Sequence, residues 1–281
     1  MKTRTITSVF ILLVTIPIIL LSKYPVYPIA LSALAVMATY EILHAIGVEK
    51  NWYLSVPAYI LAGVFPFASY FVTAEMSYTY LLTIAALIYI YMIYVMGVSV
   101  FSKGKTSVRM ISEVLLSITY VVVSFTSLSM IRYIEKDLGL YKLALVFIVS
   151  WVCDAMAYVV GSLFGKHKLI PEISPKKTVE GAIGGIVCAT LAYLLFGLIL
   201  DLAIPNIKVN YLVLAIFGLV LSVVSQLGDL IASLIKREYG VKDYGRILPG
   251  HGGIMDRFVS IMAVSTILLI LTIVFPPFAF V

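Results

Sequence analysis

Charged side chains are scarce in this chain of 281 residues. Asp, Glu, Lys and Arg make up 12% of it, whereas hydrophobic residues make up 62%. A soluble domain of this size would carry about twice that charged fraction, so the composition excludes an ordinary soluble globular protein and predicts a polytopic membrane protein. In a membrane protein, the net charge of +6 at pH 7 more often marks basic loops on the inner side than nucleic-acid binding.

Cysteine is rare as well. Cys153 and Cys188 are the two cysteines, and each lies in an apolar run without a CxxC motif. We therefore expect small buried residues rather than metal ligands. The chain also lacks a long linker, a low-complexity tract and a convincing repeat, so residues 1–281 are expected to form a single integral-membrane domain. No small-x-small cleavage site follows the first apolar run, which is therefore interpreted as a helix and not as a signal peptide.

Nine apolar runs are long enough to cross a membrane as helices, which takes about 20 residues each. The sequence thus predicts an all-α polytopic membrane protein with about nine transmembrane helices. The expected spans are 6–22, 26–46, 52–74, 77–98, 109–132, 140–163, 179–202, 210–233 and 257–277.

Basic residues are distributed unevenly between the two sides that nine alternating spans would create. Fifteen of the 20 Lys and Arg residues fall on the side of the amino terminus. Such an excess of basic residues marks the cytoplasmic face. We therefore expect the amino terminus in the cytoplasm, the carboxyl terminus outside and an active site on the cytoplasmic face of the inner membrane. The minority side holds Lys23, Arg132, Lys136, Lys142 and Lys208.

Carboxylates inside the expected spans are the first candidates for function, because a charge within a membrane is costly. Six of them fall in the cytoplasmic half of the expected bundle, namely Glu41, Glu113, Asp154, Glu180, Asp229 and Asp256. The outward half has no comparable set. A transporter needs a polar path through the whole thickness of the membrane, so this one-sided arrangement favours a site that opens to the cytoplasm.

The eighth run carries a polar stripe at three- and four-residue steps, which places its members on one face of a helix. They are Ser222, Ser225, Gln226, Asp229 and Ser233. Hydrogen bonds between helices and a functional site are both open as explanations. Function is favoured for Asp229, and for Asp154 on the sixth run, because a buried carboxylate needs a cation partner. Either a metal ion or a lysine can supply that partner.

Two other patterns have simpler interpretations. Glu41 and His44 lie three residues apart on the second run, where they could form a local pair, with a functional role as the alternative. Small residues at GxxxG spacing let two helices approach closely, so packing is the favoured role for the glycines at this spacing. These are Gly161 with Gly165 and Gly181 with Gly185.

Two polar, basic segments interrupt the apolar pattern, at 165–180 and 233–258. In the first, Pro175 breaks helical structure and Thr178 can cap the next helix, which would leave backbone N–H groups near Lys176 and Lys177 for an anionic phosphate. Ordinary basic loops attracted to anionic lipid headgroups are the alternative. In the second segment, cations lie beside flexible glycine backbone and a carboxylate, a combination suited to phosphates and a hard metal ion.

The second segment resembles the signature of the phosphatidate cytidylyltransferases, also called CDP-diacylglycerol synthases. It reads Ser233-x-x-Lys236-Arg237-x4-Lys242-Asp243-x-Gly245-x2-Leu248-Pro249-Gly250-His251-Gly252-Gly253-x2-Asp256-Arg257. Two upstream stretches are similar to the same family, Asp154-x-x-Ala157-Tyr158-x-x-Gly161 and Ser174-Pro175-Lys176-Lys177-Thr178-x-Glu180-Gly181. The resemblance thus implies that residues 150–260 carry the catalytic motifs. The chain departs from the family pattern at Val259, where an Asp is usual, and at Ser162, where an Arg is frequent.

The resemblance implies transfer of a cytidylyl group from CTP to phosphatidic acid, which gives CDP-diacylglycerol and pyrophosphate in phospholipid biosynthesis. It also implies Mg²⁺, and the number of metal ions is open. Asp229 and Asp256 are the expected metal ligands, whereas Asp154 and Glu180 either join them or hold lysines in place. The cations expected to grip phosphate are Lys176, Lys177, Lys236, Arg237, Lys242 and Arg257. Gly250, Gly252 and Gly253 would bring backbone N–H groups to phosphate oxygens, and His251 would donate to a phosphate or cap the turn.

Two rival functions are weighed against this one. A related membrane transferase would act on another lipid phosphate or on a polyprenol. An anion transporter would use the polar stripe as a pathway and the basic segments as an electrostatic funnel. No residue pattern identifies the group that reads cytosine, and self-association as a homodimer is left open.

Overall fold

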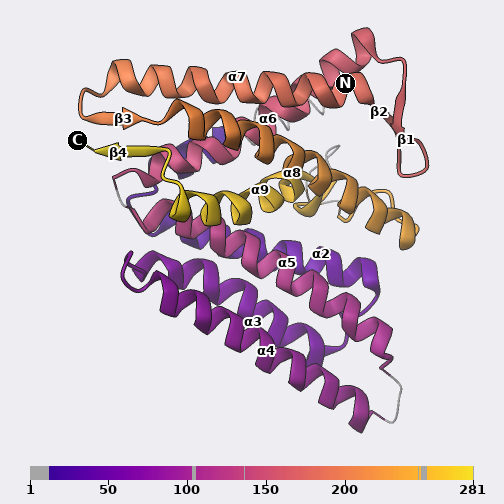
Figure 1. The fold of residues 1–281 in the computed structure, drawn as a ribbon. Coiled ribbons are helices and arrows are strands. Elements are labelled where there is room, and N and C mark those ends of the chain that lie inside the picture. Colours follow the sequence, from indigo (N-terminus) through magenta and orange to yellow (C-terminus); the bar gives the residue numbers. More distant parts are fainter. Residues whose placement is uncertain (1–12, 103–105, 136, 246, 248–251, 281) are drawn as a thin grey trace. The chain divides into compact units, whose positions relative to one another are not determined.

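Among the residues that the computed structural model describes, eight helices are long and apolar enough to cross a membrane. The structure describes residues 13–102, 106–135, 137–245, 247 and 252–280. The helices are α2 (Val26–Ile46), α3 (Trp52–Ala68, continued by the 3₁₀ turn η1, Ser69–Phe71), α4 (Ser77–Phe101), α5 (Val108–Tyr133), α6 (Gly139–Phe164), α7 (Val179–Ala203), α8 (Tyr211–Glu238) and α9 (Met255–Val274) (Figure 1). They match eight expected spans to within a few residues, which confirms the all-α membrane fold. The remaining span, 6–22, lies partly outside the described residues, and its residues 13–20 are helical.

Two short antiparallel strand pairs were not predicted. Strand β1 (Lys168–Ile170) pairs with β2 (Ser174–Thr178), and β3 (Ile207–Val209) pairs with β4 (Phe278–Phe280). Each strand lies just beyond a helix end, where the chain leaves the apolar spans. Strand pairing there satisfies backbone N–H and C=O groups that lie outside the helices. Leaving such groups without hydrogen bonds close to a membrane is costly. Pro175 lies in β2, and a two-stranded hairpin tolerates it because both strands are edges.

The chain divides into two compact units. Unit 1 comprises Met1–Lys136 and Tyr239–Phe258, and unit 2 comprises Asp137–Glu238 and Val259–Val281. In unit 1, α2, α3 and α5 pack together, and α5 is the most buried of its helices. Helix α4 packs beside α3 and α5 but buries few of its own side chains.

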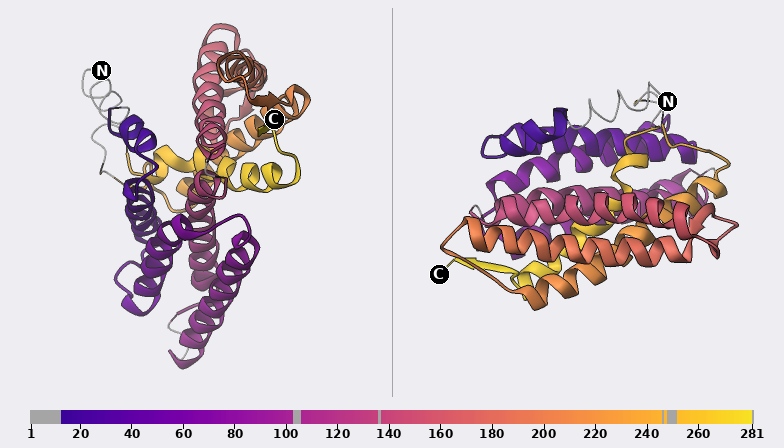
Figure 2. Two further views of the ribbon diagram at one scale, coloured as in Figure 1. Left: turned by 90° about the vertical axis from the view of Figure 1, so that its left-hand side faces the viewer. Right: turned by 90° about the horizontal axis from the view of Figure 1, so that it is seen from above.

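Unit 2 is built on the close approach of α6 and α7, which run side by side (Figure 2). A Cβ atom on Gly181 would lie 2.5 Å from the carbonyl oxygen of Ala157, and one on Gly185 would lie 2.9 Å from that of Cys153. Only glycine fits at such contacts, so the packing role predicted for the GxxxG pairs is confirmed. Cys153 is buried and free, as predicted, whereas Cys188 is only half-buried.

The two strand pairs of unit 2 lie at opposite ends of its helices (Figure 1). The β1–β2 hairpin joins the end of α6 to the start of α7, and α8 finishes at the same end. The β3–β4 pair lies where α7 ends, α8 begins and the chain returns from α9. This arrangement brings Lys177, Glu180 and Asp229 to the end of unit 2 that carries the β1–β2 hairpin.

Candidate active site

An ion pair joins Lys177 to Asp229 in unit 2. The Nζ atom of Lys177 lies 2.7 Å from Oδ2 of Asp229, and the two side chains are 26% and 42% exposed. Strand β2 holds Lys177, and Asp229 lies about two and a half turns before the end of α8. Of the two partners that the sequence left open for this carboxylate, metal or lysine, the structure supplies lysine. Since both groups stay partly exposed, an incoming anion or cation can still reach them.

The start of α7 is fixed by two side chains next to Lys177. Oγ1 of Thr178 accepts a hydrogen bond from the N–H of Gly181 at 3.2 Å, which confirms the predicted cap. Glu180, in the first turn, accepts the N–H of Lys166 at 3.1 Å and lies 2.6 Å from Nδ1 of His167. A carboxylate at this position is also favoured by the dipole of α7. Glu180 therefore closes the base of the β1–β2 hairpin, and its predicted metal role stays a prediction.

Asp154 has a hydroxyl partner on another helix. Its side chain is exposed on α6, and its Oδ2 accepts a hydrogen bond from Oγ of Ser260 on α9 at 3.3 Å. An exposed carboxylate midway along a helix of membrane-spanning length needs a polar partner on its outer side. The expectation that Asp154 matters is therefore physically consistent, but a metal role for it stays a prediction.

The polar stripe on α8 divides into two parts. Ser222 and Ser225 are fully buried. Nε2 of Gln226 donates to the carbonyl oxygen of Ala182 on α7 at 3.0 Å. This contact supports the interhelical interpretation for Gln226. Asp229, one turn further on, instead faces the hairpin through Lys177.

Asp256 organises residues 244–253 of the second polar segment, which we call the glycine-marked segment of unit 1. Its Oδ2 atom accepts hydrogen bonds from the N–H of Tyr244 at 2.9 Å and from the N–H of Gly253 at 3.0 Å. Gly252 has φ +86°, and a Cβ atom on it would lie 2.7 Å from the same oxygen. A side chain is excluded there both by conformation and by space. The carboxylate predicted to bind metal is thus also the group that joins the two ends of this segment.

Glu41 makes a long-range contact that the sequence did not predict. Its side chain is 2% exposed, and its two oxygens accept the N–H groups of Ile254 and Met255, each at 2.9 Å. The local pair suggested with His44 is wrong, because Nδ1 of His44 lies 3.3 Å from Oε1 of Glu49 instead. Backbone donors at the start of α9 compete better for a buried carboxylate than a histidine that is mostly exposed.

The other predicted cations lie at exposed or half-exposed positions. Lys236 and Arg237 are in the last turn of α8, and Lys176 is exposed on β2. Lys242 is exposed between α8 and α9, and Arg257 is exposed in the first turn of α9. Their solvent access is compatible with binding an anion. Four named residues of the predicted signature lie outside the described residues, namely Leu248, Pro249, Gly250 and His251.

The two expected metal ligands belong to different units, Asp229 to unit 2 and Asp256 to unit 1. Their sharing of one ion therefore stays a prediction. Within the described residues, no group of three or more His, Cys, Asp or Glu side chains could hold a metal by itself. Mg²⁺ is usually held by one or two carboxylates together with water and substrate phosphates. The donors therefore fit an ion that is completed by a phosphate ligand, and they do not form a closed protein cage.

Tyr244 is a site residue that the sequence reasoning missed. Its side chain is 3% exposed, although it lies in the polar segment between Asp243 and Gly245. Burial, with a smaller contribution from the charge of Asp256, raises the pKa of the Tyr244 hydroxyl above its ordinary value. Tyr244 is therefore a neutral anchor for the segment. An aromatic residue enclosed by charged and glycine positions is the signal that could have identified it.

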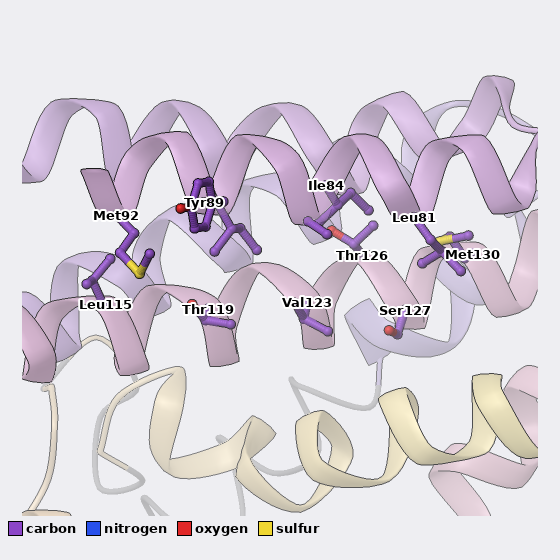
Figure 3. A pocket seen from close by; sticks show the side chains of 12 residues that line it. Leu81, Ile84, Tyr89, Met92, Leu115, Thr119, Val123, Thr126, Ser127 and Met130 are labelled. Carbon is purple, nitrogen blue, oxygen red and sulfur yellow. The ribbon is translucent and has the colours of Figure 1, made fainter. Parts of the chain in front are cut away.

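An apolar cavity of about 460 Å³ lies between α4 and α5 in unit 1 (Figure 3). Leu81, Ile84 and Met92 of α4 face Leu115 and Val123 of α5 across it (Figure 3). Among the residues described around it, no lining side chain is an Asp, Glu, Lys, Arg or His. Its described lining therefore offers no charged side chain to pair with a phosphate, and its mainly apolar character suits a hydrocarbon chain.

Comparison with known proteins agrees with the motifs. Residues 2–275 match the cytidylyltransferase family along nearly the whole chain. The chain belongs to that family. Its relatives include proteins named phosphatidate cytidylyltransferase from Staphylococcus haemolyticus, 37% identical over 275 residues, and from Staphylococcus epidermidis, 38% identical over 273 residues. Each alignment covers 97% of this chain and 99% of the relative. A similar protein of Staphylococcus aureus, with the same name, is 37% identical over 273 residues.

The two departures of this cytidylyltransferase from the family signature have different surroundings. Val259 is 3% exposed in α9. A carboxylate at that buried position would require a partner of its own, so valine fits the packing of this chain. Ser162 is exposed near the end of α6, and its hydroxyl donates to the carbonyl oxygen of Val159 at 2.8 Å. Neither residue substitutes chemically for the charged group that it replaces.

Proposed function

We propose that this protein transfers a cytidylyl group from CTP to phosphatidic acid, giving CDP-diacylglycerol and pyrophosphate. The observation that carries the proposal is the match along 97% of the chain to relatives named phosphatidate cytidylyltransferase. In this reaction an oxygen of the lipid phosphate attacks the α-phosphorus of CTP, and the bond to the β-phosphate oxygen breaks. The attacking oxygen is already anionic near neutral pH, so the reaction requires no strong general base.

The main chemical difficulty is electrostatic, because two polyanions must meet and pyrophosphate must leave with its charge neutralised. Lys177 is suited to neutralising phosphate charge, since Asp229 holds its ammonium group in place while leaving it partly exposed. Lys176 lies beside it on the same strand. Lys236, Arg237, Lys242 and Arg257 are the further cations that we propose for the triphosphate and the lipid phosphate.

We propose Mg²⁺ as the cofactor, with Asp229 and Asp256 as the carboxylates that hold it. When bound, such an ion neutralises phosphate charge and stabilises the leaving group. The chain's own contribution is to fix the carboxylates. Lys177 orients Asp229, and the backbone of Tyr244 and Gly253 orients Asp256. Asp154 and Glu180 are the alternative ligands. Asp154 accepts a hydrogen bond from Ser260, whereas Glu180 contacts His167 and accepts the N–H of Lys166.

We further propose that the site faces the cytoplasm from the inner membrane, as the distribution of Lys and Arg predicts. The amino terminus would then be cytoplasmic and the carboxyl terminus outside. The apolar cavity between α4 and α5 is chemically suited to an acyl chain of the lipid. A homodimer is compatible with these features but is not required by them.

The direct experiment supplies the purified protein with phosphatidic acid, Mg²⁺ and each nucleoside triphosphate in turn, and measures pyrophosphate release. We expect release with CTP or dCTP, and none after chelation of Mg²⁺. Release with another lipid phosphate or a polyprenol phosphate but not with phosphatidic acid would replace the proposed substrate. Absence of turnover with every nucleotide, together with anion flux in liposomes, would favour a transporter instead.

A further inference from the structure

Glu41 is a buried carboxylate whose partners lie at the other end of the chain. It stands on α2, and the backbone groups that it accepts from are 213 and 214 residues away. Oε1 accepts the N–H of Ile254 and Oε2 accepts the N–H of Met255, the residue at which α9 begins. The first N–H groups of a helix have no partner within it, and the dipole favours a negative charge there. Glu41 therefore caps α9 from a different helix.

The fit around the Glu41 carboxylate is close on two sides. A Cβ atom on Gly245 would lie 2.6 Å from Cδ of Glu41, and one on Gly253 would contact both carboxylate oxygens at less than the van der Waals distance. The backbone of the glycine-marked segment thus surrounds the carboxylate at two points eight residues apart in sequence. A larger residue at either glycine, or a shorter acid at Glu41, would separate the carboxylate from the backbone of the segment.

Asp256 acts on the same stretches of backbone. Its Oδ2 atom accepts from Tyr244, the neighbour of Gly245, and from Gly253. Glu41 accepts from the two residues that follow Gly253. The two carboxylates together tie both ends of the segment to the first turn of α9. The direction in which Asp256 points therefore depends on the two hydrogen bonds that Glu41 accepts.

We propose that Glu41 is a positioning residue for cytidylyl transfer. It holds the first turn of α9 so that Asp256 keeps the orientation needed to bind metal, and Glu41 itself does not touch substrate. This inference rests on the proposed function, in which Asp256 is a metal ligand. Partners that orient a metal ligand are typically worth about 10–100-fold in metal affinity or activity.

The test is the variant Glu41→Gln. The side-chain amide keeps one acceptor oxygen but turns an NH₂ group toward a backbone donor, so one of the two hydrogen bonds is lost. We expect the Mg²⁺ concentration for half-maximal activity to rise by about tenfold or more. Hydrogen exchange at the amides of Ile254 and Met255 should accelerate, while exchange in α5 stays unchanged.

Two control variants separate positioning from general stability. Ser69→Ala removes a buried hydroxyl that lies 2.5 Å from Oγ of Ser129, in η1 of the same unit. It should lower the unfolding temperature without changing the Mg²⁺ requirement. Glu75→Gln removes an exposed carboxylate from the turn before α4, also in unit 1, and should change neither quantity.

Two results would overturn the proposal. One is wild-type Mg²⁺ dependence in Glu41→Gln despite faster exchange at Ile254 and Met255. The other is an equal change in Mg²⁺ requirement in Ser69→Ala. Failure of the proposed function would be recognised separately, since the unmodified protein would then show no cytidylyl transfer. Even if the unmodified protein shows no cytidylyl transfer, unchanged amide exchange in Glu41→Gln would refute the claim that Glu41 stabilises the first turn of α9.

Discussion

The two units hold their candidate carboxylates in different ways. In unit 2, Asp229 is balanced by the ammonium group of Lys177, a flexible side chain that is 26% exposed. In unit 1, Asp256 and Glu41 are balanced by backbone N–H groups that cannot move without moving the chain. A lysine side chain can move from a carboxylate to a phosphate, whereas backbone donors fix the direction of the carboxylate that they bind. Unit 2 thus supplies an adjustable charge and unit 1 a rigid one.

The two units also differ in how closely their helices pack. Helices α6 and α7 of unit 2 approach until glycine backbone meets backbone. Helix α4 of unit 1 is attached mainly at a few points, where Tyr91 donates to the carbonyl oxygen of Leu54 at 2.9 Å and Tyr94 to that of Tyr53 at 3.0 Å. An apolar cavity remains between α4 and α5. Substitutions at α7 and α4 should therefore have opposite consequences.

The largest effect is expected from neutralising either proposed metal ligand. Asp229→Asn and Asp256→Asn should both abolish pyrophosphate release, because each removes negative charge that the metal needs. Asp201→Asn is the matched control, since Asp201 accepts from the hydroxyl of Tyr211 at 3.0 Å near the other end of α7, and it should retain activity. Full turnover in either of the first two variants would contradict the metal assignment.

The same positions can sharpen the contrast between adjustable and rigid carboxylates. Asp256→Ala should accelerate hydrogen exchange at the amides of Tyr244 and Gly253, since both lose their acceptor. Asp229→Ala should leave those amides unchanged. Equal acceleration in both variants would remove the distinction.

A smaller loss is expected from the adjustable cation. Lys177→Met should lower the rate of cytidylyl transfer by about 10²–10³-fold, the usual cost of removing one preorganised charge-stabilising donor. Lys208→Met provides the control, because Lys208 is exposed on β3 at the opposite end of unit 2. Steady-state rates of the two variants decide the matter. If they are indistinguishable, Lys177 has no part in the reaction.

The smallest effect concerns stability and should differ in sign between the units. Gly181→Ala would bring a Cβ atom within 2.5 Å of the carbonyl oxygen of Ala157 and should destabilise the protein by about 1–3 kcal/mol. Gly97→Ala on α4 meets no atom within 4 Å and should stabilise it by up to about 1 kcal/mol. Thermal unfolding in detergent measures both changes. A loss of stability in Gly97→Ala would mean that α4 packs more tightly than described.

The spans could be predicted because about 20 consecutive apolar residues admit few structures other than a membrane helix. The GxxxG contacts followed from the same local information. The strand pairs could not be predicted, since Lys168–Ile170 and Phe278–Phe280 are too short to show a strand pattern. The partners of the acids were harder still. Asp229 was expected to need a cation, but nothing in the sequence distinguishes lysine from metal.

Glu41 illustrates the limit of sequence reasoning most clearly. Its nearest polar neighbour along the helix, His44, suggested a local pair, whereas its partners are backbone N–H groups 213 residues away or more. Backbone donors carry no sequence signature. Tyr244 was missed because the charged and glycine residues around it suggested an exposed segment, although an aromatic residue in such surroundings is itself a signal of burial.

The most direct test of the account follows the α-phosphate of the nucleotide. Purified protein would receive phosphatidic acid, Mg²⁺ and CTP labelled either at the α- or at the γ-phosphorus, and the lipid fraction would be counted. Cytidylyl transfer predicts that the α-label enters the lipid while the γ-label leaves as pyrophosphate. Entry of the γ-label into the lipid, or of neither label, would contradict the assignment.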